Sequence, residues 1–457
     1  MAGIGFRLRK IFEHDTYLDN LRGLIISSSM AGGPIFFSIL CLILLGIFSA
    51  TFLSSQEVNV FLVTIVYIFA FSLISTGMTQ LLITRYLSDL IYQKETKQIL
   101  PTFSSVLSIT VISQLLIGLP FLFFWDIDFL YKLTALTLFI TIGCIWQLMI
   151  FLSAVKNYKI ILIAFVLGLC LSYLLAILLG KRYGLTGFLH GYAIGQIFLL
   201  FILLARIFIE FRSTEKPDFH FLQYIKIMPH LILIGLFYNL GIWIDKIIFW
   251  FSPNGHQVTS FLYAYLDYDG ATFFSFLTVI PSYTYFFVKV ETDFYCHFRA
   301  FFHSILSKKP LQQISEQKLN IANSVKESFS GLIKIQGTIA LLCLLFSREI
   351  VKFINIPVLG TLILEKAIIT VFLQMLLLTV LIFLMYFDLK GQLVVVTTVF
   401  LALNILLTVL TLKLGYEFYG YGYLFACLLA LIIGYHLLDK HINDLEYHTF
   451  VSQPLIS

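Results

Sequence analysis

Long apolar runs separated by short polar segments recur along the whole 457-residue chain. Each run is long enough to cross ~30 Å of hydrocarbon as an α-helix, which takes about 20 residues. We predict twelve membrane-spanning helices, with approximate limits at 24–53, 58–84, 102–124, 132–154, 160–180, 185–209, 221–252, 270–290, 329–347, 367–387, 392–412 and 418–438. Continuous runs of this length lack the alternation of outer-membrane strands, so the pattern predicts an all-α integral membrane protein.

The first apolar run contains a helix breaker, GGP, at Gly32, Gly33 and Pro34. Proline removes a backbone donor and glycine loosens the chain, so a helix kink is expected at these three residues. The segment before the run, MAGIGFRLRKIF, is basic and amphipathic. Because the run is far longer than the apolar part of a signal peptide and has no small-residue cleavage site behind it, we expect this first helix to be retained.

Composition and charge agree with a membrane protein. Hydrophobic residues make up 59% of the chain and charged residues 12%, against roughly 25% charged residues in a soluble domain. Placing both termini in the cytoplasm puts 22 of the 30 Lys and Arg residues on that side, which is the orientation that the positive-inside rule favours. The six cysteines form no ligand cluster and are interpreted as small buried apolar residues.

Two short strings recur at nearly equal displacements and predict an internal repeat. IFL at 150–152 recurs at 382–384, and GFLHG at 187–191 resembles GYLFA at 422–426. The matches pair spans four to six with spans ten to twelve, which predicts two six-helix lobes related as parallel repeats. The predicted division is an N-terminal lobe at 1–209, a cytoplasmic linker at 210–220 and a C-terminal lobe at 221–457. Chance recurrence in apolar sequence remains an alternative.

The longest polar segment, residues 291–328, is predicted to be cytoplasmic and to contain an amphipathic helix. Its apolar positions fall at helical spacing, at Phe294, Phe298, Phe301, Phe302 and Ile305. Two interpretations stay open for this face. It anchors the segment to the lipid surface, or it docks a cytosolic partner.

Sequence motifs for several chemistries are absent. The chain has no G-x-x-x-x-G-K-[ST], H-E-x-x-H or G-x-S-x-G motif, and no loop long enough for a nucleotide-sugar-binding domain. We therefore expect no ATPase, no enzyme, no catalytic residue, no metal, no cofactor and no nucleic-acid partner. Twelve helices in two similar halves favour a secondary transporter or flippase, and the competing class is a membrane scaffold that organises partners.

Charged residues inside the apolar runs are the main candidates for function. Asp245 and Lys246 lie in the seventh run, about 6 residues or ~9 Å from its outer end. Adjacent residues on a helix point ~100° apart and are poorly arranged to pair, so we expect Lys246 to snorkel or to pair with another helix. Asp245 either faces a substrate cavity, where it accepts sugar hydroxyls or carries a coupling proton, or bonds another helix to fix the lobe.

Further charged residues lie at the cytoplasmic ends of the predicted helices. Arg85 and Asp89 are spaced i, i+4 and form either an intrahelical pair or a gate. Glu291 and Asp293 follow the eighth run, where they receive basic residues as an inward gate or are merely solvated.

Polar and aromatic residues elsewhere are candidates for lining a sugar path. The predicted outer loop YAYLDYDG contains Asp267, Tyr268 and Asp269 and no Lys or Arg. Carboxylates accept sugar hydroxyls and aromatic faces stack on pyranose rings, although an interfacial aromatic belt explains single tyrosines equally well. Within the runs, Tyr238, Asn239, Tyr283 and Tyr285 either line the path or make interhelical hydrogen bonds.

Six segments together resemble the PelG family of bacterial exopolysaccharide exporters. They are MAGIGFRLRK, GGPIFFSIL, TQLLITRYLSD, FLSAVKNYK, WIDKIIFW and VKVETDF, spread in order over residues 1–294. The resemblance implies a two-lobed transporter of the multidrug, oligosaccharidyl-lipid and polysaccharide flippase superfamily, located in the bacterial inner membrane. It further implies transport of an N-acetylhexosamine polymer, with a cytosolic PelF-like glycosyltransferase and PelD-like and PelE-like membrane partners. A flippase for lipid-linked oligosaccharides, a drug or ion antiporter and a non-transporting scaffold are the alternatives.

Overall fold

The structure, a computed structural model, describes residues 33–155, 158–213, 215–354 and 360–451, and this part of the chain is nearly all helical. By length and composition, nine of the described helices can cross a membrane. Contacts divide the chain into two compact units. We call residues Gly33–Leu266 the N-terminal unit, and the described residues from Asp267 onward the C-terminal unit.

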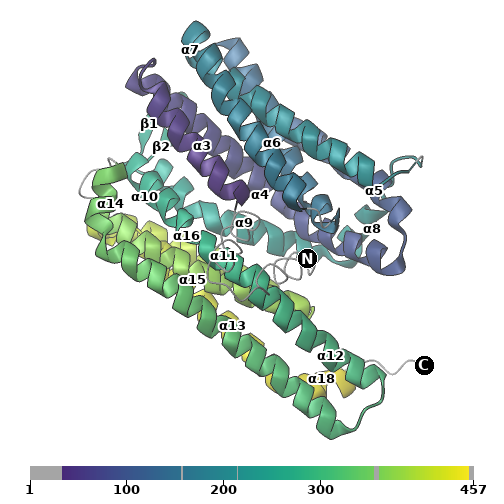
Figure 1. Cartoon of the computed structure of the whole chain (residues 1–457). Coiled ribbons are helices and arrows are strands. Elements are labelled where there is room, and N and C mark those ends of the chain that lie inside the picture. Colours follow the sequence, from purple (N-terminus) through teal and green to yellow (C-terminus); the bar gives the residue numbers. More distant parts are fainter. Residues whose placement is uncertain (1–32, 156–157, 214, 355–359, 452–457) are drawn as a thin grey trace, which may run out of the picture. The chain divides into compact units, whose positions relative to one another are not determined.

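The N-terminal unit is a helical bundle with one short hairpin (Figure 1). Around α4 lie α6 and α9, while α5 and α7 pack on α6 and α3 packs on α7. The elements are α3 (Gly33–Ser49), α4 (Ser55–Gln93), η1 (Thr96–Gln98), α5 (Ile99–Phe124), α6 (Phe129–Val155), α7 (Tyr158–Glu210), η2 (His220–Leu222), α8 (Gln223–Ile227), α9 (Pro229–Trp250), β1 (His256–Thr259) and β2 (Leu262–Ala264).

Local chemistry explains where these helices begin and break. Ser54 and Glu57 form a reciprocal capping box that starts α4. Gly184 interrupts α7 with φ of +61°, a backbone conformation that glycine adopts without steric cost. The predicted spans 160–180 and 185–209 are therefore the two halves of α7, and Pro229 begins α9 later than the predicted 221 because α8 precedes it.

Helix α9 belongs to the N-terminal unit, because its backbone comes very close to that of α4. A Cβ atom added at Gly235 would lie 2.2 Å from the Gly77 carbonyl oxygen. The segment between α7 and α9 is also attached, since the Asp218 amide donates to the Pro101 carbonyl at 3.2 Å. The compact units divide between residues 266 and 267, while the predicted lobes at 1–209 and 221–457 with a linker at 210–220 stay a prediction.

The C-terminal unit contains the remaining helices. Its elements are α10 (Leu266–Leu277), α11 (Ile280–Tyr285), the π-helical η3 (Phe286–Phe294), α12 (Tyr295–Leu306), α13 (Leu311–Leu345), α14 (Ser347–Ile354), α15 (Gly360–Tyr386), α16 (Lys390–Leu414), η4 (Tyr416–Phe418), α17 (Tyr421–Asn443) and α18 (Leu445–Phe450). Helix α17 packs on α15 and α16, and α13 packs on α12 and α15. The predicted span 270–290 is not one regular helix but the succession of α10, α11 and η3.

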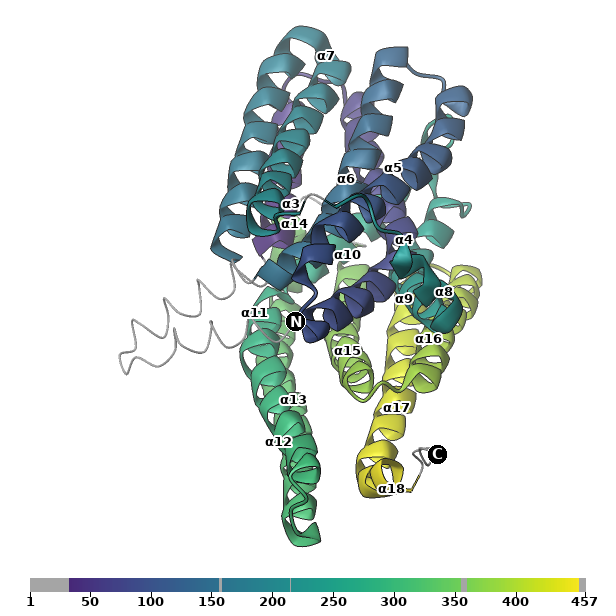
Figure 2. The same cartoon turned by 90° about the vertical axis from the view of Figure 1, so that its right-hand side faces the viewer.

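The predicted amphipathic helix exists as α12, which lies along α13 in a helical hairpin (Figure 2). Its apolar face is directed into the unit. The Phe294 ring lies 4.5 Å from that of Phe383, the Phe298 ring lies 5.5 Å from that of Phe387, and Phe301 is fully buried. This face packs on helices of its own unit, whereas the sequence analysis assigned it to lipid or to a partner.

Candidate functional site

A buried charge pair lies within α9. Asp245 has no exposed surface, Lys246 is 5% exposed, and the lysine Nζ lies 3.3 Å from both carboxylate oxygens of Asp245. The expectation that these neighbours point too far apart to pair was wrong. The long lysine side chain turns back toward the start of the helix, where Nζ also donates to the Ile242 carbonyl at 3.1 Å. Pairing offsets part of the cost of placing both charges among apolar helices.

The charge pair of α9 lies between two close contacts of this helix with α4. Helices α4 and α9 run antiparallel, since Gly77 meets Asn239 while Tyr67 stacks on Trp250 at 4.5 Å. Asp245 lies between these two contacts, and Tyr67 is itself about 18 Å along α4 from its start. The chain after α9 continues as β1 and β2, which both contact α4.

Aromatic side chains surround the pair on α9. The Trp243 ring lies 5.8 Å from Lys246 Nζ, in cation–π range, and 6.4 Å from the Trp250 ring. The Tyr67 hydroxyl donates to the Tyr263 carbonyl at 2.8 Å and accepts from the Tyr263 amide at 3.2 Å. Tyr67 thereby satisfies the backbone of β2 and holds the hairpin against α4.

A layer of polar side chains crosses the N-terminal unit from α4 to α5 and α6. Gln114 of α5 donates to Ser75 at 2.7 Å, and Gln147 of α6 donates to Thr79 at 2.7 Å. We call the following residues the polar layer: Ser72, Ser75, Thr76, Thr79, Gln114, Trp146 and Gln147. The amide oxygens of both glutamines are buried and have no hydrogen-bond partner among the described residues. Each can accept a hydrogen bond from water or from a substrate hydroxyl.

The sequence analysis did not identify the α4 part of the polar layer. Its signal is present in FSLISTGMTQ, because Ser72, Ser75, Thr76 and Thr79 are spaced i, i+3, i+4 and i+7 on one helix face. Such a polar stripe on an apolar helix indicates that this face of the helix contacts polar side chains of other helices. Of the path residues predicted on α9, Asn239 is buried and bonds to the Gly235 carbonyl at 2.8 Å, while Tyr238 is partly exposed.

The predicted pair of Arg85 and Asp89 is formed at the other end of α4. Arg85 Nε lies 3.5 Å from Asp89 Oδ1, and the Tyr224 hydroxyl of α8 donates to Asp89 Oδ2 at 2.9 Å. Burial raises the pKa of Tyr224, and its bond to the ionised Asp89 acts in the same direction. The Tyr86 hydroxyl similarly donates to Asp218 at 3.2 Å, so this corner fastens the segment before α9 to α4.

The other predicted path residues belong to the C-terminal unit. Asp267 and Asp269 lie in the first turn of α10, where carboxylates are favoured by the helix dipole, and Tyr268 between them is 1% exposed. Tyr283 and Tyr285 lie two residues apart on α11 and therefore point to different faces. The Tyr285 hydroxyl reaches the Glu327 carbonyl at 3.4 Å.

The remaining predicted site residues are described only in part. Asp293 is half-buried in η3, and Glu291 lies in the same element but its side chain is outside the described part of the structure. Gly33 and Pro34 form the first turn of α3, where proline is tolerated, and Gly32 lies outside the described residues. The kink therefore stays a prediction. Among described residues, no group of three His, Cys, Asp or Glu side chains is arranged to hold a metal ion.

Solved MATE transporters have the same fold. An outward-facing multidrug resistance transporter of the MATE family and MOP superfamily matches with a TM-score of 0.66 at 12% identity, covering 97% of this chain and 99% of that one. A mutant of the Vibrio cholerae MATE transporter VcmN matches with a TM-score of 0.67 at 13% identity, covering 93% of this chain and 98% of that one. An inward-facing multidrug resistance transporter of the MATE family matches with a TM-score of 0.63 at 9% identity, covering 98% of this chain and 99% of that one. The class is therefore a multi-pass membrane protein with the MOP transporter fold.

The family follows from the sequence match. The family described as "PelG: Putative exopolysaccharide Exporter (EPS-E)" matches residues 1–450, and the chain belongs to this family. No curated protein matches the chain significantly. Family and fold together support a polysaccharide or flippase type of transporter in a non-enzymatic role.

Proposed function

We propose that this chain exports an N-acetylhexosamine-type, Pel-like exopolysaccharide across the bacterial inner membrane, with both termini in the cytoplasm. Membership of the PelG family supports the substrate class, and the observation that carries the proposal is the buried charge pair of α9, which lies in the same unit as the polar layer. A purely structural bundle of apolar helices has no need of these groups, which are costly to bury.

In this proposal the polar layer and Asp245 provide hydrogen-bonding groups for sugar hydroxyls. The amide oxygens of Gln114 and Gln147, which have no partner among the described residues, accept hydrogen bonds, and the partly exposed ring of Trp243 offers an apolar face to pyranose C–H groups. Either the two units move to give alternating access, with an ion coupled to Asp245, or they hold a conduit through which synthesis pushes the polymer.

We further propose that a cytosolic PelF-like glycosyltransferase contacts the end of the α12–α13 hairpin, next to PelD-like and PelE-like membrane partners. The phenylalanine face of α12 is already packed within the unit, which leaves the hairpin end as the exposed surface. There Leu306 is 81% exposed and Leu311 is 65% exposed, beside Lys308 and Lys309. A mixed apolar and basic surface of this kind suits a protein partner.

The first test is the location of polymer in cells that lack this chain but keep the synthase. Polymer that accumulates in the cytoplasm supports export by this protein. Polymer that is absent from both compartments indicates a scaffold needed for synthesis. A lipid-linked oligosaccharide flippase is excluded if export survives removal of polyprenyl phosphate.

The second test restores these cells with variants at equal protein level. Asp245→Asn is expected to abolish export if an ion is coupled at this carboxylate, and only to slow export through a conduit. Asp388→Asn is the matched control, because the Asp388 side chain is 53% exposed and asparagine tolerates its φ of +54°. Normal export with Asp245→Asn would contradict any role of this residue in the path.

A further inference from the structure

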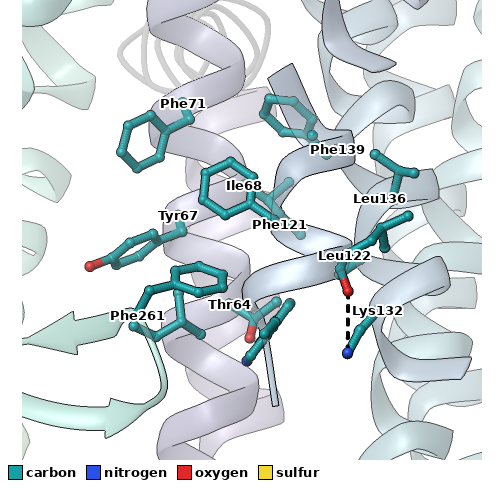
Figure 3. A pocket seen from close by; sticks show the side chains of 14 residues that line it. Thr64, Tyr67, Ile68, Phe71, Phe121, Leu122, Lys132, Leu136, Phe139 and Phe261 are labelled. Carbon is teal, nitrogen blue, oxygen red and sulfur yellow. Dashed lines mark hydrogen bonds between the residues drawn. The ribbon is translucent and has the colours of Figure 1, made fainter. Parts of the chain in front are cut away.

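An apolar cavity of about 70 Å³ lies within the N-terminal unit, where α4, α5 and α6 meet the β1–β2 hairpin (Figure 3). Tyr67 and Phe71 of α4, Phe121 of α5 and Phe139 of α6 line it, and Phe261 lies over it from the hairpin turn. A water needs about 10–15 Å³ by such a measure, so the cavity has room for several water-sized groups, yet a lining of this apolar kind stays dry.

A sugar is a poor occupant of this cavity, because its hydroxyls would find few partners there. The hydroxyls in the lining are already used: Thr64 donates to the Val60 carbonyl at 2.7 Å, and Tyr67 donates to the backbone of Tyr263. Burying unpaired hydroxyls costs several tenths to several kcal/mol each. The lining instead matches a hydrocarbon chain.

Two polar groups in the lining indicate which chemical groups a bound hydrocarbon chain is attached to. Trp125 is 5% exposed, and its indole Nε1–H is buried without a hydrogen-bond partner among the described residues. Lys132, in the first turn of α6, donates to the Leu122 carbonyl at 3.2 Å and has further N–H groups to offer (Figure 3). An uncharged donor and an ammonium group together match ester and phosphate oxygens.

We propose that this cavity binds one acyl chain of a membrane phospholipid, with Trp125 donating to an ester oxygen and Lys132 facing the phosphate. A lipid chain gains no hydrophobic energy on leaving the bilayer for an apolar cavity. Specific binding therefore depends on packing against the aromatic rings and on the two polar contacts. The bound lipid also satisfies the indole N–H, which is otherwise a buried unpaired donor.

The test uses the full chain in nanodiscs that contain phosphatidylethanolamine with a diazirine near the end of one acyl chain. After illumination, peptide mass spectrometry locates the label. We expect labelling to saturate as the probe fraction rises, and to concentrate in the peptides of α4, α5 and α6 that line the cavity. Labelling that rises linearly and spreads over the lipid-exposed side chains would overturn the proposal, as would displacement of the probe by N-acetylglucosamine oligomers.

Two variants and a matched control sharpen the result. Ala135→Phe fills the cavity and is expected to reduce its labelling about tenfold, whereas Leu133→Phe adds a ring at a 43% exposed position on the same helix and leaves labelling unchanged. Trp125→Phe keeps a ring but removes the N–H, and is expected to raise the half-saturating probe fraction by about fivefold. Unchanged saturation in both Ala135→Phe and Trp125→Phe would exclude this cavity as the lipid site.

Discussion

The repeated sequence strings pair the helix set α6–α7 with the helix set α15–α17. The two sets share backbone features but differ in their polar side chains. Helices α6 and α15 each have 27 residues. Each has, within its first two turns, a lysine that donates to a backbone carbonyl of another segment, Lys132 to Leu122 and Lys366 to Glu417. The two lysines are separated by 234 positions, between the displacements of 232 and 235 seen for the strings.

The glycines of the second string pair also have equivalent surroundings. A Cβ atom at Gly187 would lie 2.2 Å from the Leu179 carbonyl oxygen, and one at Gly422 would lie 2.6 Å from the Cα atom of Thr408. In both sets the last helix therefore starts in direct contact with the backbone of the preceding one. A glycine is needed at both positions because a Cβ atom would collide with the backbone of the neighbouring helix. The repeated glycines therefore mark two close helix crossings.

Polar side chains do not follow this pattern. Gln147 of α6 bonds to Thr79 of α4, outside its own set, whereas Gln374 of α15 accepts from Tyr423 within its set at 2.7 Å. The buried Lys246 has a carboxylate partner, and the buried Lys366 has a carbonyl and the Tyr421 ring at 4.6 Å. The comparison teaches that close backbone contacts at the glycines recur in both sets, whereas the polar contacts differ.

The largest expected difference lies between the two buried lysines. Lys246→Met leaves Asp245 buried without this partner and is expected to destabilise the protein by roughly 3–5 kcal/mol. Lys366→Met leaves no buried carboxylate without its partner, because Lys366 contacts a carbonyl and an aromatic ring. A loss of about 1–2 kcal/mol of stability is expected. Thermal unfolding of the purified variants in detergent measures both. The double variant Asp245→Leu with Lys246→Met should recover most of the loss, and equal losses for the two single variants would contradict the distinction.

The next effect concerns the equivalent glycines. Gly187→Val and Gly422→Val each force a side chain against backbone atoms and should each cost typically 1–3 kcal/mol in the same unfolding assay. Gly391→Ala is the control, because an added Cβ there meets no atom within 4 Å. A loss in only one of the two valine variants would show that these glycines are not equivalent.

A smaller effect separates the two glutamines. Gln374→Leu removes the bond from Tyr423, and roughly 0.6–1.7 kcal/mol of stability should be lost without change in export. Gln147→Leu removes the bond to Thr79 and a long bond to the Thr76 carbonyl, but it also removes a buried amide oxygen that has no partner among the described residues. Its stability should therefore change less, while export falls several-fold if the polar layer contacts the polymer. Export assays at matched protein level check this prediction, and the opposite ranking would argue against the proposed path.

The smallest effect is a pH dependence at the end of α17. The Ser315 hydroxyl donates a hydrogen bond to Glu446 at 2.6 Å, and this bond is the main cause that lowers the pKa of Glu446 below its usual 4.5. Partial burial acts in the opposite direction, and the positive charge of Lys318 lowers the pKa further. A lowered folded-state pKa contributes stability above the unfolded value, and this contribution is lost as pH falls through the lower folded value. Hydrogen exchange in α18 should therefore accelerate, relative to the intrinsic rate, only as the pH falls below about 5 and on through the lowered pKa. Glu446→Gln should show no such dependence.

The fold was largely predictable because membrane insertion depends on run length and apolarity, which are local properties. The nearly all-helical membrane fold and the family are confirmed, and the break at Gly184 falls between two predicted spans. The unit boundary was not predictable in this way. It follows from the contact of Gly235 with Gly77, which are distant in the sequence.

The candidate site shows the same division. Asp245 and Lys246 were identified from the sequence because charges within an apolar run are rare and costly. Their pairing was missed, because helix geometry places adjacent Cβ atoms apart but does not fix where a long lysine side chain ends. The polar layer was missed as a unit, since each serine or threonine taken singly also bonds to its own helix backbone.

The sequence by itself determined the long apolar helices and the family, because both are written in residue order and type. Only the tertiary structure decided which helices pack into each unit, that Asp245 and Lys246 are buried as a pair, and which glutamine oxygens have no partner among the described residues. The physical reason is that burial and hydrogen bonding depend on segments brought together from far apart in the chain, such as Tyr67 with Trp250 and Gln147 with Thr79.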